Sequence, residues 1–324
     1  MDQHTPHRAT ATDDAPPLGR LQEVGGRRLM VHRSGSGGPA VVFVSGASAV
    51  GLDYLNLHDR VAEFTTSVIY DRAGTGWSDP AELPRTAATA AEELRDLLHA
   101  IEVPAPYLLV GHSLGGGYAR RFAQLFPDEV AGLLLLEPFH EDWDAYLPEP
   151  LQLRKQAADQ AAADQQVTDQ QVTEQQVTDL PELTEELVEQ FRGVLAGYFA
   201  LWPDPVREVL VERHLSLDWL QSGVLERSNL VGLLDELADG GGTPDVPLIV
   251  FTAMGVDPGQ AAFMSDRLLR EQNAGKRALF AALAASVPRG EHRVLENAGH
   301  SWLHVEGEGA VIQAIRDLLD RVDR

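Results

Sequence analysis

Residues 107–126 constrain the fold more than any other stretch, because they combine a buried strand, a very tight turn and a helix. The apolar run 107–110 is typical of a strand inside a parallel sheet. Apolar side chains at helical spacing follow over 118–126. Between them lies a G-x-S-x-G pattern, residues 111–115, centred on Ser113. Glycine is needed on both sides because a turn this sharp leaves no room for a Cβ.

Such a turn has a chemical consequence for Ser113. It leaves the hydroxyl exposed at the edge of the sheet, with the start of a helix behind it. A negatively charged oxygen formed there meets free backbone N–H groups and the positive end of the helix dipole. The pattern therefore predicts a nucleophilic serine. The alternative, a glycine-rich turn without a chemical role, is disfavoured by the apolar strand expected next, at 133–136.

Strands and helices alternate along most of the chain. A two-residue hairpin turn, Gly25-Gly26, lies between two short strands near its start. Repeated strand, helix and strand predict an α/β fold, with a mostly parallel central sheet flanked by helices. Apolar runs predict strands at 40–44, 67–71, 107–110, 130–136, 247–252 and 292–295, and helical periodicity predicts helices at 85–101, 260–285 and 309–322.

Ser113 and its surroundings resemble the nucleophile elbow of the α/β-hydrolase superfamily. The resemblance implies the α/β-hydrolase fold and a serine hydrolase of the capped, esterase-like or lipase-like kind. It divides the chain into a catalytic domain in two segments (20–137 and 244–324) and a helical cap inserted between them (138–243). The composition of residues 1–19, which have no apolar stretch, predicts a disordered tail.

The insertion, 138–243, departs from the alternation of strands and helices. Between residues 141 and 190 it has 13 acidic residues against Arg154 and Lys155. Residues 165–179 repeat QQVT followed by an acid three times. Valines five positions apart rotate by about 140° per repeat on a helix, so they form no buried stripe. We expect the repeat to be a solvated helix or a disordered insert, and a partner-binding role stays open.

Aromatic side chains flank the repeat. The insertion has three of the five tryptophans, Trp143, Trp202 and Trp219. As a cap over the sheet, these side chains would cover the Ser113 site with apolar surface and exclude water. Alternatively, they form the core of the insertion itself.

His300 is the expected general base, because an imidazole is suited to take the serine proton at neutral pH. It follows the last predicted strand in a sequence that resembles the A-G-H loop of the superfamily, in the chain order serine, acid, histidine. His304 lies one helical turn further on, and His292 lies at the start of a strand. His112 neighbours the nucleophile, but its side chain should point away from the site.

Two carboxylates are candidates for the acid of the triad. Asp257 lies in the loop after the strand 247–252, where the superfamily usually places its acid, although the glycine expected at the strand end is displaced to Gly255. Glu137 ends the strand 130–136 and is the alternative acid, or else a salt-bridged or helix-capping residue. We predict Asp257 as the acid.

The oxyanion hole is expected to use two backbone N–H groups, those of Ala47 and Leu114. In the superfamily, the residue after the glycine of an H-G loop donates one of them. Here Ser45 replaces the usual histidine, but a main-chain donor does not require that side chain. An ordinary glycine and serine turn is the alternative.

Residues 71–78 read D-R-x-G-x-G-x-S. This run resembles a stretch that supports the loop beside the active site in many capped hydrolases. It lacks the G-x-G-x-x-G spacing of a dinucleotide-binding turn, and a tryptophan stands where the helix would begin. We therefore predict a structural role.

Composition excludes several classes of function. With 26 Lys+Arg against 49 Asp+Glu, bulk charge disfavours binding to nucleic acid or to an anionic membrane. The absence of cysteine removes disulfides and thiolate metal sites. No segment is apolar enough for a membrane span or a signal peptide. We expect a soluble, cytoplasmic enzyme without cofactor or metal, whose partner is a small-molecule ester; the oligomeric state stays open.

These observations predict a serine hydrolase that cleaves a carboxylic ester or lactone with an apolar moiety through an acyl-enzyme. An acyltransferase or thioesterase with the same triad is the alternative, and a non-catalytic ligand receptor is a third interpretation. A serine rather than an aspartate nucleophile argues against haloalkane dehalogenase or epoxide hydrolase chemistry. The chain length of the substrate is left open.

Overall fold

The computed structural model describes residues 15–168, 185–261 and 264–322. Their strands form one sheet in the order β1-β2-β4-β3-β5-β6-β7-β8. β2 pairs antiparallel with both β1 and β4, and every other pairing is parallel. The strands are β1 (Arg20–Val24), β2 (Arg27–Ser34), β3 (Val41–Val44), β4 (Ser67–Tyr70), β5 (Tyr107–His112), β6 (Val130–Leu136), β7 (Leu248–Ala253) and β8 (Gly290–Leu295).

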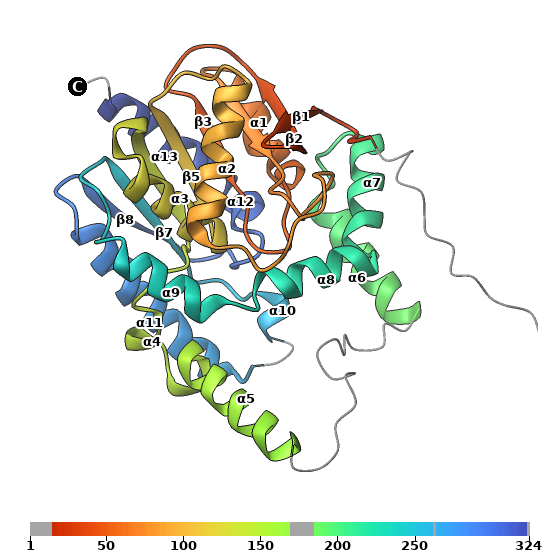
Figure 1. Cartoon of the computed structure of the whole chain (residues 1–324), viewed down its shortest axis with the longest axis vertical. Coiled ribbons are helices and arrows are strands. Elements are labelled where there is room, and N and C mark those ends of the chain that lie inside the picture. The colour runs from red at the N-terminus through yellow and green to blue at the C-terminus, as the bar shows by residue number, and fades with distance from the viewer. Residues whose placement is uncertain (1–14, 169–184, 262–263, 323–324) are drawn as a thin grey trace, which may run out of the picture.

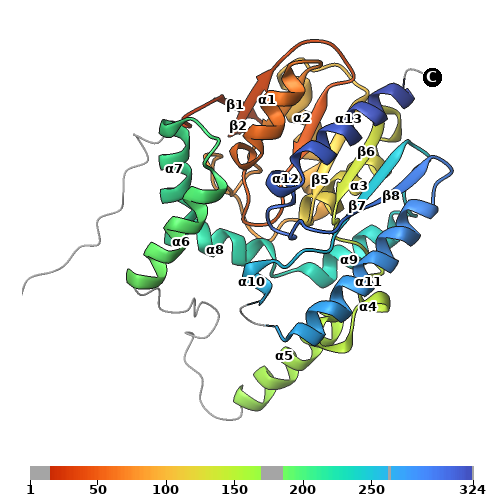
Figure 2. The same cartoon turned by 180° about the vertical axis from the view of Figure 1, so that it is seen from behind.

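Helices cover both faces of the sheet. Figure 1 shows α2 and α3 in front of it, and Figure 2 shows α1 and α13 on the opposite face. The helices are α1 (Leu55–Ala62), α2 (Ala87–Ala100), α3 (Leu114–Leu125), α10 (Pro258–Ala261), α11 (Asp266–Ala285), α12 (Leu303–Glu306) and α13 (Glu308–Val322), with 3-10 turns η1 (Gly51–Tyr54), η2 (Pro127–Glu129) and η3 (Glu149–Leu151). The predicted α/β fold is confirmed.

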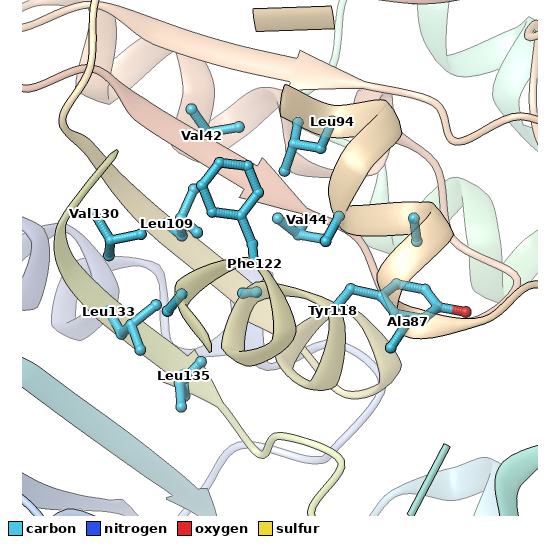
Figure 3. Close-up of a cluster of buried hydrophobic side chains, with 14 of the residues drawn as sticks. Val42, Val44, Ala87, Leu94, Leu109, Tyr118, Phe122, Val130, Leu133 and Leu135 are labelled. Carbon is cyan, nitrogen blue, oxygen red and sulfur yellow. The ribbon is translucent and has the colours of Figure 1, made fainter. Parts of the chain in front are cut away.

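The sheet separates two hydrophobic cores, because successive side chains of a strand point to opposite faces. In β3, Val42 and Val44 belong to one core, and Val41 and Phe43 belong to the other. Figure 3 shows the first core, where Phe122 of α3 lies against side chains of the sheet. This packing holds β5 and α3, the two elements on either side of Ser113.

Local signals account for most element boundaries. The hairpin at Gly25-Gly26 is confirmed, since β1 and β2 pair on either side of it. Thr86 caps α2, its side chain accepting a hydrogen bond from the N–H of Thr89 at 3.1 Å. The predicted helix 260–285 is interrupted instead: its main part, α11, begins after Ser265, whose side chain accepts from the N–H of Leu268.

The insertion between β6 and β7 is helical in its described residues and lies beside α10 at one end of the sheet (Figure 2). Residues 1–14 of the predicted tail and 169–179 of the repeat lie outside the described residues. The helices of the insertion are α4 (Trp143–Tyr146), α5 (Leu153–Thr168), α6 (Glu185–Tyr198), α7 (Asp204–His214), α8 (Leu217–Glu226) and α9 (Leu230–Asp239).

One tryptophan of the insertion lies where the expected covering role places it, and the other two are buried at the contact with the sheet domain, not in a separate core of the insertion. Trp202 and Trp219 are buried against the sheet domain, and their ring N–H groups donate to the carbonyls of Leu52 and Ser48 at 2.8 and 3.0 Å. Trp143 lines the cavity that contains Ser113. Within 15–168, 185–261 and 264–322, no helix is both long and apolar enough to cross a membrane.

Candidate active site

Ser113 occupies the turn between β5 and α3 in a strained backbone conformation, with φ 52° and ψ −122°. The glycines of the pattern are required by close backbone contacts. A Cβ on Gly111 would lie 2.7 Å from the Cα of Gly116, and a Cβ on Gly115 would lie 2.1 Å from the carbonyl oxygen of Val44. The crowding predicted from the G-x-S-x-G pattern is therefore present.

His300 lies beside Ser113, in the turn between β8 and α12. The Ser113 hydroxyl is 3.0 Å from Nε2 of His300, and Nδ1 of His300 is 2.7 Å from Oε2 of Glu137. An ionised carboxylate only accepts hydrogen bonds, so Nδ1 is the protonated nitrogen and Nε2 is free to accept the serine proton. The structure thus brings a serine, a histidine and a carboxylate into one hydrogen-bonded chain.

The carboxylate against His300 belongs to Glu137 and not to Asp257, which corrects the expected geometry. Glu137 is the first residue after β6 and is 2% exposed. Its Oε1 accepts from the N–H of Ala253 at 2.8 Å, and its Oε2 also accepts from Nζ of Lys276 at 2.9 Å. Glu137 is therefore both ion-paired, as the alternative interpretation held, and bonded to the histidine.

Asp257 binds the backbone of the loop that contains His300, and not the imidazole ring. Its carboxylate accepts hydrogen bonds from the N–H groups of Ser301 and Gln260, at 2.8 and 3.2 Å. Burial alone would raise the pKa of Asp257, but the hydrogen bonds from Ser301 hold it below its ordinary value. With its oxygens committed to these donors, Asp257 orients the residue that follows His300 and leaves Nδ1 to Glu137.

Lys276 had no signal in the sequence. It lies in the middle of α11 and is 3% exposed, yet its ammonium group reaches Glu137. Burial alone would raise the pKa of the Glu137 carboxyl, but the charge of Lys276 and the hydrogen bond with His300 outweigh burial and lower it. Glu137 therefore stays ionised beside the histidine at neutral pH.

The three other histidines that were considered as the base have different surroundings. His112 accepts from the hydroxyl of Tyr54 at Nδ1, over 2.7 Å, and donates from Nε2 to the carbonyl oxygen of His300, over 2.9 Å. Burial lowers the pKa of His112 well below its ordinary value, so the ring is neutral and holds the backbone of the histidine loop. His304 packs on the ring of Tyr54, with centroids 4.4 Å apart, and His292 pairs with Thr252 across β7 and β8.

The loop after β3 lies against the elbow. A Cβ on Gly46 would lie 3.3 Å from the Cβ of Ser113, so Ala47 is close to the nucleophile. Among the described residues, no acceptor is paired with the N–H of Ala47 or with that of Leu114. Both residues line the same cavity as the serine, which is the arrangement that two donors of an oxyanion hole need.

Ser113 and His300 open into a cavity of about 830 Å³ between the sheet domain and the insertion. The apolar part of its lining comes mainly from the insertion and the loops beside it: Phe139, Trp143, Leu153, Leu230, Met264 and Trp302. Polar groups include Asp53, His214 and Arg227. A site that covers a substrate on several sides with apolar surface and has a few convergent polar groups is typical of small-molecule binding.

Comparison with known proteins decides the family. Residues 41–314 match the model of the alpha/beta hydrolase family. The chain belongs to this family. The predicted superfamily is therefore confirmed.

Curated relatives of this family member match over part of its length. An uncharacterized protein of Mycobacterium tuberculosis is 35% identical over 124 residues, which are 38% of this chain and 36% of the relative. The dihydrolipoyllysine-residue acetyltransferase component of the acetoin cleaving system of Cupriavidus necator is 30% identical over 134 residues, 41% of this chain and 36% of that protein. The matches thus span little more than a third of these relatives.

Solved structures match over nearly the whole chain. They include a thermophilic esterase from Thermogutta terrifontis (TM-score 0.58, 19% identity, 93% of this chain and 97% of that one). The esterase EaEST from Exiguobacterium antarcticum has a TM-score of 0.59 at 18% identity, covering 95% and 100%. Est816, described as an N-acyl homoserine lactone degrading enzyme, has a TM-score of 0.55 at 17% identity, covering 92% and 99%. At these identities the similarity shows the fold alone.

Proposed function

We propose that this hydrolase cleaves a carboxylic ester or lactone with an apolar moiety, through an acyl-enzyme on Ser113. The observation that supports the proposal is the chain of two hydrogen bonds, Ser113 to His300 at 3.0 Å and His300 to Glu137 at 2.7 Å. Serine is a weak nucleophile unless a base takes its proton, and a carboxylate on the far nitrogen keeps the base in the required tautomer.

The proposed reaction has two halves. Ser113 Oγ attacks the carbonyl carbon while Nε2 of His300 takes the hydroxyl proton, and Glu137 stabilises the resulting imidazolium. The N–H groups of Ala47 and Leu114 stabilise the oxyanion. The C–O bond to the leaving group then breaks as His300 returns the proton to the departing oxygen. Water, activated by the same histidine, attacks the acyl-enzyme and releases the acid.

The apolar moiety is proposed from the lining of the cavity, to which Phe139, Trp143 and Leu230 contribute. Two of the similar structures are esterases and one is described as degrading a lactone, so the proposed class of bond is one that this fold accommodates. We propose that the insertion acts as a cap, which closes the cavity over this part of the substrate and excludes water from it.

A panel of p-nitrophenyl esters of graded chain length tests the proposal. Ser113→Ala should lower kcat on the preferred ester by on the order of 10⁴ to 10⁶, because the nucleophile is lost. Ser286→Ala is the matched control: its hydroxyl donates to the carbonyl of Leu283 at the end of α11, and turnover should be unchanged. Retention of a tenth of the activity in Ser113→Ala would contradict the proposal.

The same assay with and without an added acceptor alcohol separates hydrolysis from acyl transfer. A hydrolase releases acid at the same rate in both, whereas an acyltransferase forms the new ester in preference to the acid. Failure of the protein to react with a fluorophosphonate would favour the ligand-receptor interpretation, since the probe requires an activated serine.

A further inference from the structure

A buried ion pair joins the sheet domain to the insertion next to the proposed oxyanion hole. Arg72 follows β4, and Glu226 is the last residue of α8. Nη2 and Nε of Arg72 lie 2.6 and 3.0 Å from Oε1 of Glu226, and the two side chains are 2% and 3% exposed. Charges this deeply buried are retained only where further hydrogen bonds satisfy them.

Those further hydrogen bonds all go to the loop after β3. Nη1 of Arg72 donates to the carbonyl oxygen of Ser45 at 2.6 Å, and Nη2 donates to that of Gly46 at 2.8 Å. Oε2 of Glu226 accepts from the N–H of Ser48 at 2.9 Å. The ion pair therefore holds the backbone on both sides of Ala47.

Peptide planarity turns these contacts into control of the Ala47 N–H. The carbonyl of Gly46 and the N–H of Ala47 belong to one planar trans peptide and point in opposite directions. When Arg72 fixes the Gly46 carbonyl, it also fixes the direction of that N–H. The peptide on the other side of Ala47 is fixed in the same way, through Ser48 and Glu226.

Other residues of the insertion hold Ser48 from the same side. Its backbone is left-handed, with φ 62°. The ring N–H of Trp219 donates to its carbonyl oxygen, and Nη1 of Arg227 donates to its hydroxyl, both at 3.0 Å. A Cβ on Gly223 would lie 1.8 Å from that hydroxyl oxygen, so α8 packs against the loop with no spare room.

We propose that Glu226 is a positioning residue for catalysis: through Arg72 and Ser48 it aims the N–H of Ala47 at the oxyanion. The inference rests on the proposed function and deepens it. Since Glu226 belongs to the insertion, the oxyanion hole is complete only when the insertion is seated on the sheet domain. Substrate entry that displaces α8 would then also release one of the two donors.

The test compares Glu226→Gln with Glu236→Gln. Glu236 of α9 also joins the insertion to the sheet domain, accepting from the N–H groups of Ala87 and Ala88 at 2.7 Å each, but it does so at the start of α2. Glu226→Gln should lower kcat on p-nitrophenyl esters by on the order of 10²-fold, as expected for a displaced oxyanion donor, with little change in KM. Glu236→Gln should keep a kcat within about twofold of the parent, because this partly buried carboxylate contacts the start of α2 and not the loop that holds Ala47.

A thionoester of the same acid separates positioning from general loosening. Sulfur is a weak hydrogen-bond acceptor, so the tetrahedral intermediate of a thionoester gains little stabilisation from the Ala47 N–H. Glu226→Gln should therefore lose much less rate on the thionoester than on the ester. Equal losses on both substrates, or a kcat within about threefold of the parent on the ester, would overturn the proposal.

Hydrogen exchange of the intact protein gives a readout without turnover. Backbone amides over 45–50 should exchange faster in Glu226→Gln, and those in Glu236→Gln should match the parent. Unchanged exchange in Glu226→Gln would overturn the inference. Ester hydrolysis that persists in Ser113→Ala would instead overturn the proposed function. It would not affect the exchange of amides 45–50 in Glu226→Gln, because that measurement does not depend on turnover.

Trp219→Phe is the second variant that tests the proposal, in case Glu226→Gln does not fold. It removes the ring N–H that binds the Ser48 carbonyl, together with part of an indole ring that packs on Trp77 and His214. It should lower kcat several-fold on the ester while sparing the thionoester. A folded Trp219→Phe protein whose 45–50 amides exchange faster than in the parent, but which keeps full ester activity, would overturn the proposal.

Discussion

At the residue scale, the chemistry depends on which carboxylate reaches His300. The motif around Ser113 is a local signal, and His300 is recognised from the order of serine, acid and histidine along the chain. The sequence therefore predicts both Ser113 and His300. The acid has no such signal, because Asp257 and Glu137 each follow a strand of the same sheet. The choice depends on contacts that form only in the folded protein. Asp257 accepts a hydrogen bond from the N–H of Ser301, whereas Glu137 accepts one from Nδ1 of the His300 imidazole.

An amide substitution at each candidate acid distinguishes them. Glu137→Gln should lower kcat by on the order of 10⁴, because the amide no longer holds the His300 tautomer, as happens when the aspartate of a serine protease triad is replaced by asparagine. Asp257→Asn should cost far less, since it keeps one acceptor oxygen for the backbone. Steady-state kinetics on one p-nitrophenyl ester measures both. The reverse ranking would return the role to Asp257.

At the element scale, the elbow and the strands were predictable because their signals are local. β5, β6 and β7 are buried along their whole length, and most of their residues are apolar. The beginning of α11 was missed because Ser265 caps a new helix there. The contacts of the insertion with the loop after β3 were not predictable, because they join residues more than 150 positions apart, such as Arg72 and Glu226.

Crowding at the elbow leads to a stability prediction. Gly115→Ala would place a Cβ 2.1 Å from the carbonyl oxygen of Val44, a backbone atom that cannot move aside cheaply. We expect it to lower the free energy of unfolding by at least about 3 kcal/mol, as severe overpacking does. Chemical denaturation measures the change.

Gly309→Ala is the control for that substitution. Gly309 lies in the first turn of α13, and a Cβ there would have no heavy atom within 4 Å. Alanine should stabilise the protein slightly, by about 0.5 kcal/mol, because it restricts the unfolded chain. Equal effects of the two substitutions would mean that the elbow is not crowded.

At the scale of the whole molecule, histidines buried in several regions couple the fold to pH. Burial lowers the pKa of His58 and His140 to about 3 and that of His304 to about 4, from an ordinary value of 6.5. Unfolded, these rings take up protons below pH 6.5 that the folded protein excludes. Their contribution to stability is therefore present above pH 6.5 and is lost as the pH falls towards 4.

Asp71 acts in the opposite sense, because burial raises its pKa to about 7. The folded protein then holds a proton that the unfolded chain releases above its ordinary pKa of 3.8, so falling pH favours the fold at this one group. Carboxyls with lowered pKa values, such as Glu137, lose their contribution only below the ordinary value of 4.5. Between about pH 6.5 and 5 the histidines outnumber Asp71 and decide the sign.

We therefore expect stability to fall on mild acidification. Each pH unit is worth on the order of 1.4 kcal/mol per group, so the loss from about pH 7.5 to about 5.5 should reach roughly a few kcal/mol. Denaturation midpoints measured across this range at constant ionic strength give the change. A midpoint that stays constant or rises would show that the buried rings are not held neutral.

The acyl-enzyme on Ser113 is the step on which the whole proposed mechanism depends, and it can be trapped. p-Nitrophenyl dimethylcarbamate forms a carbamoyl-enzyme that hydrolyses slowly, so the adduct can be located by mass spectrometry after digestion. We predict one p-nitrophenolate released per chain and one dimethylcarbamoyl group on Ser113, with neither in Ser113→Ala. A modified residue other than Ser113, or turnover of esters by a protein that never carries the group, would contradict the mechanism.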